Sequence, residues 1–158
     1  MQHLLTICLF CFASLISCKQ SKKKKPEIKS AHSSYTLPVP KGWTTELFMI
    51  PISFASSIHY KGVEDIRFAQ GWGNLQSNEY WTYAFLWSLE GAQEINAEII
   101  ERNISAYYAG LIASNIESRK ITADKIFPPK VTIEKTKVDA GDIETFKGNI
   151  YMLDYMQQ

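Results

Sequence analysis

An alternating aromatic segment constrains the fold of this chain more than any other part of its sequence. Residues two apart in a strand lie on the same face of a sheet, and residues 79–89 place a bulky side chain at every second position. The other face of this segment is also partly apolar, which favours a central strand whose bulky face packs against a helix. The bulky residues are Trp81, Tyr83, Phe85, Trp87 and Leu89.

The segments around this strand predict the rest of the fold. Apolar residues recur every three or four positions in residues 92–115, which predicts an amphipathic helix capped by Gly91. The order of strands, helix and hairpin predicts an α+β domain with a mainly antiparallel sheet and one long amphipathic helix packed on it. We expect an edge strand or extended arm at 35–40, strands at 43–50, 52–60 and 64–70, and a hairpin formed by 131–138 and 143–156.

The stretch Val39-Pro40-Lys41-Gly42-Trp43, together with this order of elements, resembles the Mog1/PsbP-like group. The resemblance implies an α/β sandwich used for binding rather than catalysis, and it assigns no functional residue. The strand-like pattern near the C-terminus continues to Met156 and has two interpretations. The domain lacks a closing strand because it is truncated, or it simply ends on a terminal strand.

The N-terminus carries a different signal. Residues 4–17 are strongly apolar, but a helix needs about 20 such residues to cross a bilayer, so this segment indicates a signal peptide at 1–17. The residues Leu15-Ile16-Ser17-Cys18 resemble the signal-peptide ending of bacterial lipoproteins. This resemblance implies cleavage before Cys18 and thioether attachment to its sulfur of a diacylglycerol, which bears two fatty acyl chains such as palmitate. Its partner would then be membrane lipid, bound through acylated Cys18.

The remaining cysteines support this interpretation. Cys8 and Cys11 lie inside the leader, so a processed chain keeps only Cys18, which excludes a disulfide framework and a cysteine-based metal site. Residues 18–30 form a polar tether that contains six of the 17 basic residues and one of the 16 acids. A single domain at 31–158 keeps 11 basic and 15 acidic residues, near −4, which argues against nucleic acid as a partner.

Few residues of the domain suggest a functional site. Trp43 and Trp72 lie beside glycines in predicted turns, so we expect them to contact a ligand or partner. His59 with Glu64 or Asp65 forms the alternative, an acid–base pair of a hydrolase-like or transferase-like envelope enzyme. The turn at Asp139, Asp142 and Glu144 lacks the glycine and the ligand count of a calcium loop. We therefore expect no catalytic residue, no metal ligand and no cofactor.

Together these features predict a lipoprotein of the bacterial cell envelope. Lys19 follows Cys18 where an aspartate would signal inner-membrane retention, which favours the outer membrane, facing the periplasm. The domain is expected to be a non-catalytic binding domain whose partner is an envelope protein or a glycan. A structural lipoprotein without a small ligand is a further interpretation.

Overall fold

Two antiparallel sheets and one long helix make up residues 35–157, the part of the chain that the computed structural model describes. Strands β1 (Thr44–Ile50), β2 (Gly62–Phe68) and β3 (Tyr83–Leu89) form a sheet in the order β1-β2-β3. Helix α1 (Ala97–Asn115) follows, and strands β4 (Lys130–Lys135) and β5 (Phe146–Tyr151) form a hairpin. Two short 3-10 helices, η1 (Ala123–Lys125) and η2 (Tyr155–Gln157), complete the described part. The predicted α+β fold is confirmed.

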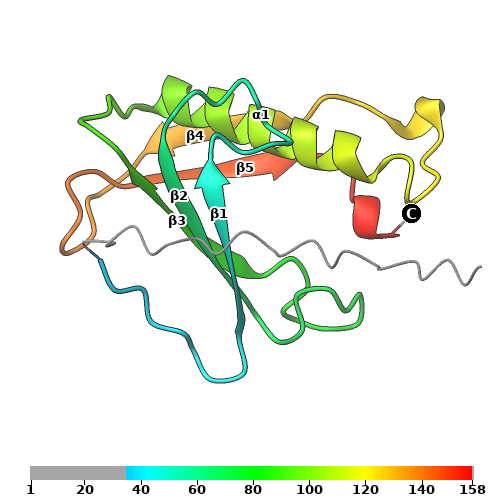
Figure 1. Cartoon of the computed structure of the whole chain (residues 1–158), viewed down its shortest axis with the longest axis horizontal. Coiled ribbons are helices and arrows are strands. Elements are labelled where there is room, and N and C mark those ends of the chain that lie inside the picture. The colour runs from blue at the N-terminus through cyan, green and yellow to red at the C-terminus, as the bar shows by residue number, and fades with distance from the viewer. Residues whose placement is uncertain (1–34, 158) are drawn as a thin grey trace, which may run out of the picture. The chain divides into compact units, whose positions relative to one another are not determined.

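Helix α1 lies beside β4 and crosses the three-stranded sheet (Figure 1). The aromatic face of β3 packs against it as predicted, because the Phe85 ring stacks on Tyr107 with the ring centroids 5.8 Å apart. The helix also approaches the loop between β1 and β2 closely. A Cβ atom on Gly110 would lie 1.8 Å from the Phe54 carbonyl oxygen, so this contact requires a residue without a side chain.

The predicted arm at residues 35–40 forms no strand and covers the face of β2 that points away from α1. The Arg67 side chain donates hydrogen bonds to the Leu37 carbonyl (3.0 Å) and the Pro38 carbonyl (3.4 Å). Arg67 is only 8% exposed and forms an ion pair with Asp65, which neutralises the buried charge. The Tyr35 hydroxyl also donates to Asp65 (3.4 Å), so the arm is held by the Arg67–Asp65 pair rather than by strand pairing.

The structure corrects five details of the prediction. β3 is an edge strand, not a central one, because β2 occupies the middle of the sheet. Residues 52–60 form turns rather than a strand, and β3 begins at Tyr83 rather than near residue 79. The helix begins at Ala97, since the side chain of Asn96, and not Gly91, caps it by accepting a hydrogen bond from the Ile99 amide. The final strand ends at Tyr151, and the residues after it turn back into the core through Leu153 and Tyr155.

Candidate functional site

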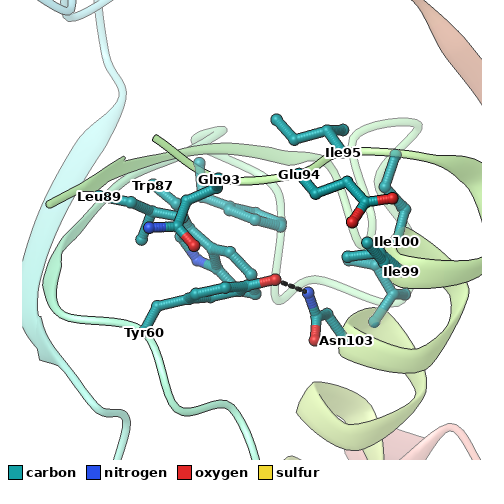
Figure 2. Close-up of a pocket in the computed structure, with 11 residues that line it drawn as sticks. Tyr60, Trp87, Leu89, Gln93, Glu94, Ile95, Ile99, Ile100 and Asn103 are labelled. Atoms are coloured by element: carbon teal, nitrogen blue, oxygen red, sulfur yellow. Dashed lines mark hydrogen bonds between the residues drawn. The ribbon is translucent and has the colours of Figure 1, made fainter. Parts of the chain in front are cut away.

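A largely apolar pocket of about 320 Å³ lies between β3 and the start of α1. Figure 2 shows the Tyr60 and Trp87 side chains on one side of it and Ile95, Ile99 and Ile100 on the other. The late start of α1 shapes the mouth of this pocket, because residues 92–96 are not helical and Gln93, Glu94 and Ile95 among them line it. A volume near 300 Å³ is at the lower end of the range for small-ligand sites.

A small number of polar groups face this pocket. The Asn103 side-chain amide donates to the Tyr60 hydroxyl over 3.0 Å (Figure 2), so the Tyr60 proton stays available to an acceptor in the pocket. At the mouth, Gln93 donates to the Glu90 carbonyl (2.7 Å) and Glu94 accepts from Asn96 (3.1 Å). These local hydrogen bonds fix the rim. The site can therefore bind a compact apolar group that carries one hydrogen-bond acceptor for the Tyr60 hydroxyl.

A buried carboxyl lies behind the pocket wall. Glu64 is 0% exposed and is paired in register with Phe48 on β1 and with Trp87 on β3. Within residues 35–157, neither its oxygens nor the Trp87 indole nitrogen makes a hydrogen bond of ordinary geometry. Burial raises the pKa of the Glu64 carboxyl above its ordinary value of 4.5, and polar contacts from Tyr107 and Trp87 oppose this rise. Glu64 does not line the pocket, so we assign it no contact with a ligand.

The structure does not bring together the predicted acid–base pair. His59 is exposed, whereas Glu64 is fully buried, and the Asp65 carboxylate accepts a hydrogen bond from Arg67 (3.0 Å). No hydrogen bond joins His59 to either carboxylate in the described part of the chain. Nothing in this geometry supports the enzymatic alternative.

The two predicted contact tryptophans lie apart from the pocket. Trp72 is half-buried, and its ring packs against Phe68 with the centroids 4.6 Å apart. It also lines a small aromatic cavity of about 140 Å³. Trp43 is half-buried just before β1, and its amide donates to the Pro40 carbonyl over 3.1 Å. Their role as contact residues stays a prediction.

Sequence reasoning missed the residues that build the pocket. Trp87 was predicted as core, and Tyr60 and Asn103 were not singled out, because they meet only when the loop before β2 packs against α1. Cys18, the predicted lipidation site, lies outside the described residues. Between residues 35 and 157 the structure contains no cluster of three metal-binding side chains and no helix long and apolar enough to cross a bilayer.

Comparisons of this chain with protein-family models, with curated proteins and with solved structures found no match. The resemblances to bacterial lipoproteins and to the Mog1/PsbP-like group therefore stay predictions from the sequence. Any statement on function depends on the leader and on the geometry of the described domain.

Proposed function

We propose that this protein is a lipoprotein of the bacterial cell envelope whose domain binds an envelope component without catalysing a reaction. The pocket between β3 and α1 is the observation that carries the binding function. Its walls are apolar, its rim is fixed by local hydrogen bonds, and Tyr60 supplies a directed donor. The ligand class that fits is a compact apolar group with one hydrogen-bond acceptor, borne by a small molecule, a glycan substituent or a protein side chain.

The anchor in this proposal depends on the leader. Two acyl chains on Cys18 would hold the protein on a membrane, since stable anchoring takes about two such signals. The basic tether at 18–30 would add attraction to anionic lipid headgroups. Detergent phase partitioning of wild type and Cys18→Ala, expressed in a bacterium, tests this anchor. Wild type is expected in the detergent phase and the variant in the aqueous phase, and equal partitioning would refute anchoring.

The pocket can be tested with the neutral fluorophore N-phenyl-1-naphthylamine, which brightens when it leaves water. Ile99→Trp fills the pocket, whereas Ile143→Trp adds the same side chain at a position that is 95% exposed in the β4–β5 turn. We expect Ile99→Trp to weaken probe binding about tenfold or more and Ile143→Trp to leave it unchanged. Equal binding by the two variants would show that the pocket is not the site.

A further inference from the structure

The outer edge of β3 presents unpaired backbone groups. The Ala69 amide donates to the Thr82 carbonyl (3.1 Å) and the Glu90 amide donates to the Lys61 carbonyl (2.8 Å), so the even-numbered residues of this segment point their backbone toward β2. In an antiparallel pair this direction alternates, and the odd-numbered residues Tyr83, Phe85 and Trp87 therefore point N–H and C=O outward. Among residues 35–157, no backbone partner pairs with these outward groups.

The outer edge of β5 is open in the same way. The Thr136 amide donates to the Thr145 carbonyl over 2.9 Å, which directs the backbone of Phe146, Gly148 and Ile150 away from β4. At the other edge of the hairpin, the outward amide of Ile133 on β4 donates to the Glu101 carboxylate of α1 (2.7 Å). The middle of the β4 edge is thus occupied by α1, whereas the outward groups of β5 have no backbone partner among residues 35–157.

Both open edges line one groove. Phe85, Phe146, Gly148 and Ile150 line a cavity of about 450 Å³, and Tyr83 and Ile150 line an adjoining cavity of about 340 Å³. Ile150 and Tyr108 border both cavities, so the two cavities are neighbours, and together they are called the groove below.

The residues that line the groove show how the two strand edges run along it. Ile100, Ile104 and Tyr108 of α1 contribute its floor, and Figure 1 shows α1 running alongside the β4–β5 hairpin. Trp81, which precedes β3, and Tyr83 line a cavity with residues 150–154, whereas Phe85 lines one with residues 144–150. The two edges therefore run in opposite directions along the groove.

We propose that this groove accepts an extended segment of a partner polypeptide, which inserts between β3 and β5 and joins the two sheets into one. Such a strand would lie about 4.8 Å from each neighbour and would exchange backbone hydrogen bonds with both. Every second side chain of the inserted segment would point onto Ile100, Ile104 and Tyr108, so this segment needs an apolar residue at every second position.

Charges at the groove indicate the rest of the partner's chemistry. Asp142 lines one end of the groove, where Glu144 is ion-paired with Lys135. Asp154, which accepts a hydrogen bond from the Tyr80 hydroxyl, lines the other end. Lys147 also lines the groove, but it forms an ion pair with Glu134 (3.1 Å). The partner segment that complements the groove therefore has apolar residues at every second position and basic residues at both ends.

This site is separable from the proposed pocket. The pocket and the groove share Phe85 and two helix residues, but Ile99 lines only the pocket and Ile150 lines only the groove. Loss of fluorophore binding in Ile99→Trp tests the pocket, and a peptide experiment tests the groove. A negative result for one site does not contradict the proposal for the other site.

The test is selection of a random nine-residue peptide library on the full chain, followed by affinity measurements on two variants. Ile150→Pro removes an outward N–H from β5 without removing a hydrogen bond to β4, because that N–H points away from β4. Val131→Pro is the matched control, since Val131 pairs with Ile150 on the same rung and its N–H points to the opposite edge of the hairpin. A thermal melt of both variants establishes that each is folded.

We expect enriched peptides to show alternating apolar residues with lysine or arginine at the ends. Their affinity should fall about tenfold or more in Ile150→Pro and stay near wild type in Val131→Pro. Amide hydrogen exchange of wild type should show protection on both edges, at Phe85 and at Gly148, when peptide is bound. This readout does not depend on the folding of either variant.

Three results would overturn the proposal. The library yields no enriched peptide, the enriched peptides bind Ile150→Pro as tightly as wild type, or protection rises on one edge only. A wild-type dimer that Ile150→Pro dissociates, seen by light scattering, would also overturn it, because the occupant would then be a second copy of this chain.

Discussion

Replacing Glu64 with glutamine should stabilise the domain at neutral pH. The carboxyl is 0% exposed and lacks an ordinary hydrogen bond within the described residues, and burial raises its pKa above 4.5. A group whose pKa is raised in the folded state adds stability below its unfolded pKa and loses it as the pH rises through the folded value. Wild type should therefore become less stable relative to Glu64→Gln between about pH 4.5 and pH 7.

The size of this effect at pH 7 is limited by the free-energy cost of keeping a carboxyl protonated, about 1.4 kcal/mol for each pH unit above 4.5 and so at most about 3 kcal/mol. A domain of this size shifts its melting temperature by about 4 °C per kcal/mol, so Glu64→Gln should melt up to about 12 °C above wild type at pH 7. Well below pH 4.5, where the carboxyl is protonated in both the folded and the unfolded state, the difference should shrink toward zero. Circular dichroism melts at pH 7 and at about pH 3 measure this.

Glu46→Gln is the matched control, because Glu46 lies on the neighbouring strand with an exposed side chain. It should melt close to wild type at both pH values. If Glu64→Gln melts below wild type at pH 7, the carboxylate has a compensating partner and the reasoning about its burial is wrong.

Three further substitutions test the packing of the domain. Gly110→Ala should lower the free energy of unfolding by about 1–3 kcal/mol in urea titration, because its Cβ would overlap the Phe54 carbonyl; unchanged stability would contradict this contact. Arg67→Met should cost about 3 kcal/mol, since it leaves a buried acid without its partner, and limited proteolysis should then cut the released arm; an arm that stays protected would refute its role. Trp72→Ala should cost about 1–2 kcal/mol through loss of the Phe68 ring contact, while fluorophore binding stays unchanged; loss of binding without loss of stability would make Trp72 a contact residue.

The fold class could be predicted because its signals are local. The period-two aromatics of β3 correctly indicated the face that packs on a helix, and the turn at residues 139–142 correctly placed the β4–β5 hairpin. The position of β3 at the sheet edge could not be predicted, because its pairing is set by residues distant in the sequence. The second face of β3 carries half-buried Leu86, and apolar residues on both faces are typical of a central strand.

The pocket could not be predicted from the sequence for a related reason. Residues 92–95 continue the helical pattern of α1, so the sequence predicted a helix that begins directly after Gly91. The Asn96 side chain caps the helix instead, and the residues before it are not helical and line the pocket together with Trp87. Glu64 was chosen as an acid beside His59, but its burial arises from cross-strand neighbours that a single sequence does not reveal.

The intact mass of the protein, extracted from bacterial envelopes, tests the central claim of a lipid-anchored binding domain most directly. The account predicts a chain that begins at Cys18 and carries the added mass of diacylglycerol with its two acyl chains. A full-length chain with its leader uncut and a free thiol at Cys18 would contradict it.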